Sequence, residues 1–86
     1  MIIIYGKSNC SFCTKAKNIA EMHNLPYQYH SIDDEQIKEQ MFMLVPNAKT
    51  VPQIWWGDKH IGGYDQFVQE IKILLEIMDM ENYERN

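Results

Sequence analysis

The stretch that decides the fold is residues 2–22, IIIYGKSNCSFCTKAKNIAEM. It opens with four apolar residues without alternation, which predicts a short strand buried on both faces. Turn-forming residues follow at 6–9, and helical spacing then runs from Ser11 to about Asn24. The apolar residues expected on one side of this helix are Phe12, Cys13, Ala16, Ile19 and Ala20. A strand, a turn and a helix therefore follow one another, with two cysteines at the turn.

The middle of the chain predicts a second strand and a second helix. YQYHSI (27–32) is rich in aromatic residues and alternates as a strand does. Either Asp33 or Asp34 can cap the helix that follows, which must stop before Pro46. Its apolar positions are Ile37, Met41 and Leu44.

The last third predicts a hairpin and a long helix. VPQIWW (51–56) and KHIG (59–62) flank Gly57-Asp58, a two-residue turn. After Gly62-Gly63 we expect Asp65 to cap the last helix, and the polar tail MENYERN (80–86) to fray from it. The inner face of this helix is predicted to carry Phe67, Val68, Ile71, Leu74, Leu75 and Met78.

The element order is therefore β-α-β-α-β-β-α, an α/β fold with one four-stranded mixed sheet and three helices. A helix joins the first two strands, so they should be parallel, whereas the hairpin strands must be antiparallel. No linker or repeat interrupts residues 1–86, and we expect a single domain.

Composition narrows the classes of function. The chain of 86 residues has a formal net charge of -4, which argues against a nucleic-acid partner. Its apolar start is shorter than a signal peptide requires, and no run approaches a membrane span. Only two cysteines occur, Cys10 and Cys13, and a bridge across so short a loop stabilises little. Such a pair without a secretory signal is typical of the reducing cytoplasm.

The position of the cysteines favours redox chemistry. Cys10 lies at a predicted helix start, where unpaired backbone amides and the helix dipole stabilise a thiolate, the nucleophile of disulfide exchange. Lys7 and neighbouring lysines act in the same direction. Cys13 lies one turn further on, within reach of a disulfide. Cys10 is therefore the expected attacking thiol and Cys13 the resolving one.

Two other interpretations of the pair carry less weight. A structural zinc needs four ligands, and His23, His30 and His60 do not pair at the spacing of a zinc site. Two inert buried cysteines are a common alternative. A C-x-x-C pair beside a βαβ pattern is nevertheless the usual redox arrangement, so no metal is expected.

Two further motifs lie downstream. KTVPQIW (49–55) places Pro52 where a central strand should begin, which is consistent with a cis Val51-Pro52 bond or with an ordinary strand-start proline. HIGGYDQF (60–67) has two glycines ahead of a helix, and such a helix start attracts anions.

Together, YGKSNCSFC (5–13), KTVPQIW and HIGGYDQF resemble the glutaredoxin family of the thioredoxin fold, from Ile2 to about Leu75. The resemblance implies a glutathione-dependent oxidoreductase that reduces protein disulfides, such as that of ribonucleotide reductase, and glutathione mixed disulfides. It implies a monomer in which glutathione is the cosubstrate. The glutathione-binding residues that it implies are Lys7, Phe12, Thr50, Val51, Pro52, Gly63, Tyr64 and Asp65.

Within that resemblance, Val51 would pair its backbone with the cysteinyl part of glutathione, as an added strand does. Gly63, Tyr64 and Asp65 would hold the γ-glutamyl end, and Lys7 would face the glycine carboxylate. A second-helix residue usually helps at that carboxylate, for which the candidates are Gln36, Lys38 and Gln40, with Lys49 as a substitute.

The chain departs from the family at Ser11 and Phe12, where proline and tyrosine are usual. Relatives with serine at that position sometimes share a [2Fe–2S] cluster between two subunits, so an iron–sulfur protein is one alternative. A redoxin recharged by thioredoxin reductase is another.

Overall fold

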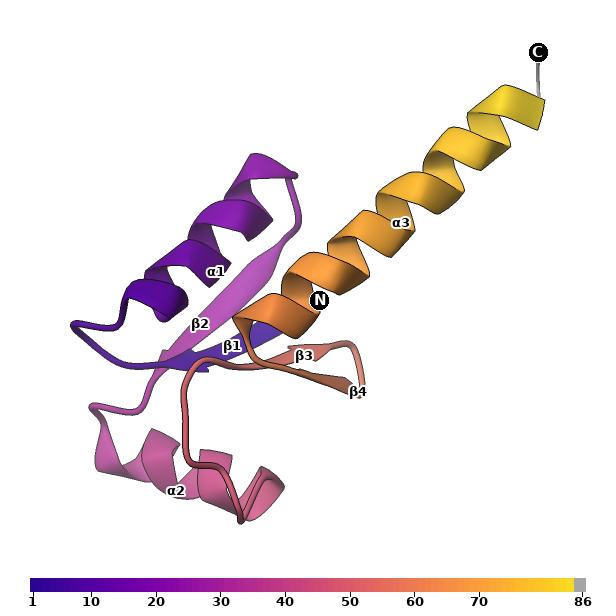
Figure 1. Ribbon diagram of the computed structural model, residues 1–86. Coiled ribbons are helices and arrows are strands. Elements are labelled where there is room, and N and C mark those ends of the chain that lie inside the picture. Colours follow the sequence, from indigo (N-terminus) through magenta and orange to yellow (C-terminus); the bar gives the residue numbers. More distant parts are fainter. Residues whose placement is uncertain (85–86) are drawn as a thin grey trace.

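The computed structural model describes the backbone of residues 1–84 and the side chains of residues 1–79. Its elements follow the predicted order: β1 (Ile2–Gly6), α1 (Ser11–Met22), β2 (Tyr27–Ser31), α2 (Glu35–Leu44), β3 (Gln53–Trp56), β4 (Lys59–Gly62) and α3 (Tyr64–Glu84). Three helices and one four-stranded mixed sheet are therefore present, as the sequence predicted (Figure 1).

The sheet has the strand order β2-β1-β3-β4. β1 pairs with β2 in parallel, as predicted for strands joined by a helix, and pairs with β3 antiparallel on its other side. β3 and β4 form the predicted hairpin, with an irregularity in register between Ile54 and Trp55. The first strand of the chain is therefore central, which explains why Ile2 and Ile4 are buried.

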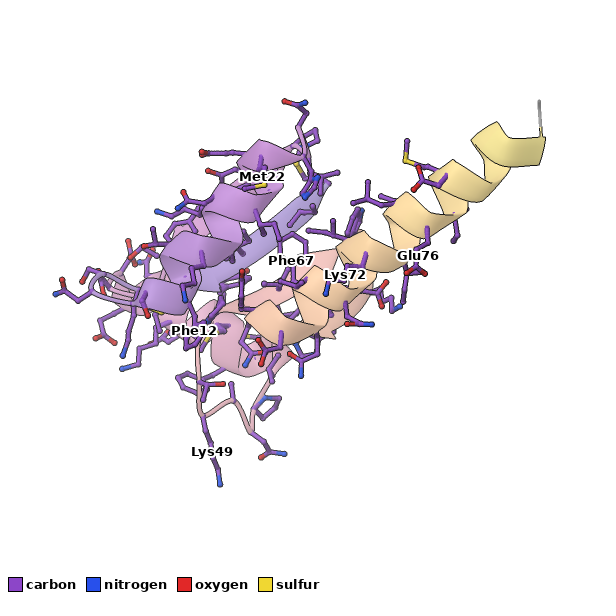
Figure 2. All side chains as sticks on the ribbon, turned by 45° about the horizontal axis from the view of Figure 1, so that its top comes forward. Phe12, Met22, Lys49, Phe67, Lys72 and Glu76 are labelled. Atoms are coloured by element: carbon purple, nitrogen blue, oxygen red, sulfur yellow. A yellow bond between two sulfur atoms is a disulfide. The ribbon has the colours of Figure 1, made fainter. Side chains whose placement is uncertain are left out.

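The main core lies between the sheet and two helices. Figure 1 shows α1 and α3 on one side of the sheet and α2 on the other. Alanines on α1 let that helix approach the sheet closely, while Phe67 of α3 is fully buried (Figure 2). The buried residues of this cluster are Ile2, Ile4, Ala16, Ala20, Ile54, Phe67 and Ile71. Trp56 joins its edge, with its ring T-shaped against Phe67.

The opposite face of the sheet is covered more thinly. Met41 is the buried residue of α2, whereas Leu44 is 58% exposed, contrary to the sequence prediction. Leu44 is the last residue of this ten-residue helix, whereas the buried Met41 lies one turn further in. Trp55 faces this side and stacks with His60 at 4.6 Å, so the two tryptophans point to opposite faces as alternation predicts.

Helix starts confirm one predicted cap and correct another. Asp34 caps α2, accepting from the amides of Gln36 and Ile37 at 2.8 and 3.4 Å. Asp65, however, does not cap α3. The helix begins at Tyr64, and the carbonyl of Gly63 accepts its first helical hydrogen bond from Phe67 at 3.1 Å, which leaves Asp65 inside the first turn.

The last helix is longer and less covered than predicted. Part of the tail expected to fray belongs to α3, which continues to Glu84; residues 85–86 lie outside the described part. Leu75 and Met78, predicted to face inward, are 40% and 50% exposed. A helix of 21 residues spans about 31 Å, whereas a four-residue strand spans about 13 Å. The second half of α3 therefore runs past the sheet (Figure 1).

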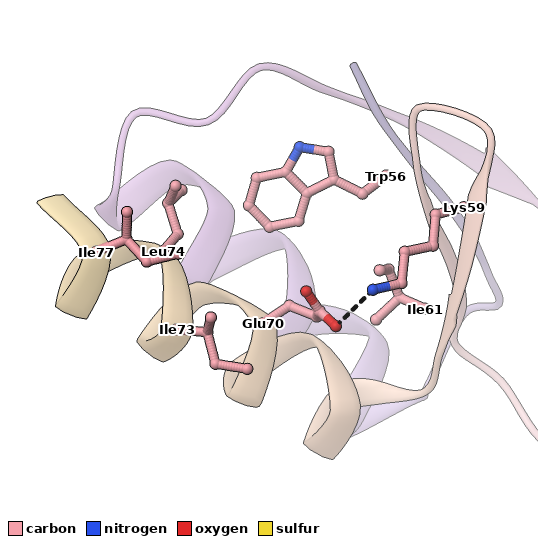
Figure 3. A pocket seen from close by; sticks show the side chains of 7 residues that line it. All are labelled: Trp56, Lys59, Ile61, Glu70, Ile73, Leu74 and Ile77. Atoms are coloured by element: carbon pink, nitrogen blue, oxygen red, sulfur yellow. Dashed lines mark hydrogen bonds and ion pairs between the residues drawn. The ribbon is translucent and has the colours of Figure 1, made fainter.

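A groove of about 300 Å³ lies between the hairpin and the stretch of α3 from Glu70 to Ile77 (Figure 3). Trp56 forms its floor with apolar side chains of α3, and the ion pair between Lys59 and Glu70, 3.0 Å, crosses its edge. The groove is at the hairpin end of the sheet, away from the cysteines. Over the described residues, no helix has the length and apolarity needed to cross a lipid bilayer.

Candidate active site

Cys10 occupies the position immediately before α1 and acts as its N-cap. A disulfide joins it to Cys13, one turn into the helix, across a Cα–Cα distance of 5.3 Å. Cys13 is 1% exposed, whereas Cys10 is only partly buried. The accessible sulfur is therefore the one at the helix start, as predicted for an attacking and a resolving cysteine.

The helix start surrounds the Cys10 sulfur with donors. The amide of Cys13 donates to Cys10 Sγ at 3.2 Å, and no acidic residue lies in the first turn of α1. The Thr14 hydroxyl and amide both donate to the Cys10 carbonyl, at 3.3 and 3.1 Å, which holds the cysteine backbone against the helix. In the reduced protein the same amide and the positive end of the helix dipole favour a thiolate.

Two hydrogen bonds hold the loop that precedes Cys10. The Ser8 amide donates to Asp33 Oδ2 at 3.2 Å, and the Tyr29 hydroxyl donates to the Lys7 carbonyl at 3.3 Å. Hydrogen bonding from Ser8, helped by the charge of Lys7, lowers the pKa of the Asp33 carboxyl from its ordinary value of 3.8. Asn9 completes the turn in the left-handed region, with φ of 55°. Contacts from β2 and the turn after it therefore position the loop.

The aromatic residue between the two cysteines does not lie where the helical pattern placed it. Phe12 is 51% exposed and packs against Tyr64 of α3, with ring centroids 5.8 Å apart. It lies on the first turn of α1, outside the sheet, so α3 rather than the core is its neighbour. The Lys15 ammonium lies over its ring at 5.0 Å, and that of Lys17 lies over Tyr29 at 4.2 Å.

The Val51-Pro52 peptide bond is cis, which settles the two interpretations that the sequence left open. The Val51 carbonyl oxygen lies 3.8 Å from Cys10 Sγ, so this segment faces the reactive sulfur directly. Gln53, which is buried, donates to the Thr50 carbonyl at 2.9 Å and contacts His60 at 2.9 Å through its own carbonyl oxygen. A hydrogen-bonded side chain thus holds the backbone opposite Cys10.

Two grooves meet at Thr50 and Val51. The first, of about 230 Å³, ends at the start of α3, where Gly62 with φ of 113° turns the chain in a conformation that suits glycine. Its lining contains seven of the eight predicted glutathione residues together with Gln66: Phe12, Thr50, Val51, Pro52, Gly63, Tyr64 and Asp65. The loop residue Lys7, the eighth, lines the second groove instead.

The second groove, of about 150 Å³, has two cationic side chains at its wall, Lys7 and Lys49. Among the alternatives for the fourth contact, none of Gln36, Lys38 and Gln40 lines it, and Lys38 lines a separate hollow on the outer face of α2. Figure 2 shows Lys49 extending outward from the segment ahead of β3. The structure thus places Lys49, rather than Gln36, Lys38 or Gln40, in the same groove as Lys7.

Sequence reasoning missed two site residues. Gln53 was counted only as part of a strand, and nothing local marks its bonds to Thr50 and His60. Gln66 had a signal, because a glutamine three residues after a helix cap is half of a capping box. Among the described side chains, no three His, Cys, Asp or Glu residues gather as a metal site requires.

Three features define the class of the protein. They are the cysteine pair at the start of α1, the Val51-Pro52 segment opposite Cys10, and the mixed sheet of order β2-β1-β3-β4. The protein is a thiol–disulfide oxidoreductase of the thioredoxin fold.

The family follows from comparison with known proteins. The Glutaredoxin family model matches residues 2–61, and the chain belongs to the glutaredoxin family. It is 38% identical to Glutaredoxin 1 of Escherichia coli (strain K12) over 77 residues, which cover 81% of this chain and 91% of that protein.

Solved structures agree with this assignment. Reduced Escherichia coli glutaredoxin superposes with a TM-score of 0.72 at 36% identity, covering 87% of this chain and 96% of that one. A buckwheat glutaredoxin, solved in complex with glutathione, has the same fold, with a TM-score of 0.70 at 24% identity over 83% of this chain and 67% of that one.

Proposed function

We propose that the protein is a glutathione-dependent oxidoreductase that reduces protein disulfides and glutathione mixed disulfides. The observation that carries the proposal is the pair of grooves on either side of Val51, whose carbonyl faces Cys10 Sγ at 3.8 Å. One groove ends in helix amides and Asp65, and the other in two lysines. That order of charges complements a tripeptide with a zwitterionic end, a central thiol and a terminal carboxylate.

In this arrangement the γ-glutamyl carboxylate of glutathione binds the first-turn amides of α3, and its ammonium faces Asp65. The cysteinyl backbone pairs with Val51, which brings the glutathione sulfur to Cys10. The glycine carboxylate then reaches Lys7 and Lys49. A glutaredoxin of the same fold has been solved with glutathione, which supports this choice of ligand.

Reduction of a protein disulfide uses both cysteines. The Cys10 thiolate attacks one sulfur, the substrate S–S bond breaks, and a mixed disulfide forms while the other substrate sulfur leaves as a thiolate and takes up a proton. Cys13, as its thiolate, then attacks Cys10 Sγ. This releases the second substrate sulfur and forms the Cys10–Cys13 disulfide that the structure contains. Two electrons have passed to the substrate.

Glutathione restores the dithiol. One glutathione thiolate attacks Cys10 Sγ and releases Cys13, and a second attacks the resulting mixed disulfide to give oxidised glutathione and free Cys10. A glutathione mixed disulfide needs only Cys10, because its thiolate removes the glutathionyl group directly and the second glutathione regenerates it.

The test compares electron sources. We expect NADPH consumption with glutathione and glutathione reductase, using a glutathionylated peptide as substrate, and little with thioredoxin reductase alone. Turnover with thioredoxin reductase and none with glutathione would reject the proposal in favour of a redoxin recharged by that flavoenzyme.

Cysteine variants test the separate roles of Cys10 and Cys13. Cys10→Ser should abolish both activities, whereas Cys13→Ser should keep removal of glutathione and lose reduction of a protein disulfide. Full activity of Cys10→Ser would contradict the assignment of the nucleophile.

A further inference from the structure

The C-terminal end of α2 exposes apolar side chains to solvent. Phe42, Met43 and Leu44 follow one another there, and all three are exposed. The last turn of α2 holds no basic residue, although cations are favoured at a helix C-terminus by the helix dipole. A contiguous exposed apolar patch is typical of an interaction surface. The end of α2 therefore has the character of a contact surface rather than of a solvated helix end.

Phe42 connects this end of α2 to the active site. It lines the groove of about 150 Å³ that reaches Val51, whose carbonyl oxygen lies 3.8 Å from Cys10 Sγ. It also lines, together with Met43, a hollow of about 460 Å³ on the outer face of α2. The surface that begins opposite the reactive sulfur therefore continues along the groove and onto Phe42 and Met43.

The charges along this path change from the groove to the hollow. The groove carries Lys7 and Lys49, whereas Glu35, Lys38 and Glu39 line the hollow beside its two apolar residues. A ligand with an acidic group at the groove is therefore favoured. At the hollow, an apolar group is favoured over a second acidic one.

Glutathione does not extend to the hollow in the proposed binding mode, because its terminal carboxylate ends at Lys7 and Lys49. A protein substrate differs, since its chain continues beyond the cysteine whose sulfur Cys10 attacks. The residues that follow this cysteine take the place of the glycine of glutathione in the groove. The chain after them is directed towards α2.

We propose that Phe42 and Met43 bind an apolar side chain of the protein substrate, on the C-terminal side of its reactive cysteine. The segment that fits carries an acidic residue, which faces Lys7 and Lys49, followed by a side chain such as that of leucine. This inference rests on the proposed function and deepens it, because it adds a determinant of the choice among protein disulfides.

The first test compares two peptides, each with an internal disulfide. The second cysteine of each is followed either by Gly-Glu-Leu-Leu or by Gly-Glu-Ser-Ser. With glutathione, glutathione reductase and NADPH, we expect kcat/KM to be about 3- to 10-fold higher for the leucine peptide, the order of magnitude gained by burying one or two methylene-sized groups. Single-cysteine versions carrying glutathione should turn over equally, because Cys10 then attacks the glutathione sulfur and glutathione occupies the groove.

Variants of two exposed methionines locate the contact. Met43→Ser should abolish the preference for the leucine peptide. Its turnover of the glutathionylated peptide and its midpoint of thermal unfolding should stay at the wild-type values, because Met43 is 82% exposed and does not line the groove. Met22→Ser, at the far end of α1 from Cys10, is the matched control and should keep the preference (Figure 2).

A trapped complex gives a readout that needs no turnover. In Cys13→Ser, the Cys10 thiolate attacks the cysteine sulfur of a peptide activated with thionitrobenzoate. The thionitrobenzoate leaves as a thiolate and a Cys10–peptide disulfide remains. The methyl resonance of Met43 and the ring resonances of Phe42 should shift with the leucine tail and stay unshifted with the serine tail.

Equal kcat/KM for the two disulfide peptides in the wild type would overturn the inference, and so would a Met43→Ser variant that keeps the preference. A dimer that Met43→Ser abolishes, with no effect on the peptides, would instead make this surface an interface between copies of the chain. Failure of the proposed function gives a different result, since the wild type would then reduce neither peptide with glutathione. The trapped complex, which forms without glutathione, would still report the contact.

Discussion

The Cys13 amide donates to Cys10 Sγ at 3.2 Å, so the residue that resolves the disulfide also supplies the hydrogen bond that stabilises the attacking sulfur. Both roles follow from one turn of helix, which brings a residue three positions further along the chain back beside the first. The backbone of a buried residue thereby prepares the chemistry of an accessible one.

This contact predicts the acidity of Cys10. In Cys13→Ser, which keeps the amide, we expect the pKa of the Cys10 thiol to lie below the ordinary ~8.5, because an amide and a helix dipole both favour the anion. The rate of alkylation by iodoacetamide, measured against pH, reports it. An inflection at or above the ordinary value would show that the helix start does not activate this sulfur.

Asp33 predicts a pH dependence of stability. Its pKa is lowered in the folded state by hydrogen bonds from Ser8, so its contribution to stability is present above the unfolded value of 3.8 and is lost as pH falls through the folded value. The wild type should therefore unfold at a higher temperature than Asp33→Asn near neutrality. The two midpoints should begin to converge as the pH falls below about 4 and should meet only below the folded pKa of Asp33. A difference that is constant down to pH 2 would exclude the carboxylate as its source.

The second groove predicts which lysine serves glutathione. Lys49→Met should raise the KM for glutathione about 3- to 10-fold, since a charged hydrogen bond or ion pair at a partly exposed site is lost. Lys38→Met is the control, because Lys38 lines a separate hollow on α2. Steady-state kinetics at varied glutathione concentration measure both. The opposite ranking would restore a second-helix residue to this role.

Met41 predicts how α2 is attached to the sheet. It is 2% exposed, whereas Met43 on the same helix is 82% exposed. Met41→Ala should lower the free energy of unfolding by about 2–5 kcal/mol, as truncation of a buried methionine does. Met43→Ala should stay within about 0.5 kcal/mol of the wild type. Urea unfolding curves for the two variants check this, and equal effects would mean that α2 packs differently.

The position of Gly6, just ahead of the active-site loop, has no room for a side chain. A Cβ there would overlap the ring and hydroxyl of Tyr29, which also bonds the Lys7 carbonyl. Gly6→Ala should cost about 1–3 kcal/mol of stability, measured by urea unfolding, because a packed ring must move. In a Tyr29→Leu background, the same Gly6→Ala substitution should cost less stability than it does in the wild type. Additive costs in the double variant would point to a backbone effect of alanine instead.

Local sequence patterns were enough to predict which segments form helices and strands, and the order of these elements along the chain. Strands at 2–5 and 27–32, the Gly57-Asp58 turn and a helix cap at Asp33 or Asp34 all depend on neighbouring residues. All of them appear, with Asp34 as the cap. Predictions about burial were wrong for Leu44, Leu75 and Met78, which lie toward the ends of their helices and are exposed. The prediction for Phe12 was wrong because its side chain packs against Tyr64, which is distant in sequence. Periodicity states which side chains share a helix face, but it does not state what covers that face.

By itself, the sequence determined a C-x-x-C pair at a helix start and a β-α-β-α-β-β-α chain, because spacing, turn residues and caps act over a few positions. Tertiary structure decided that β1 lies at the centre, with β3 beside it, and that Val51 faces Cys10 across 41 positions of sequence. It also decided that Lys49 joins Lys7. These relationships depend on which strands pair and on how closely helices pack, and such long-range contacts form only once the whole core is buried.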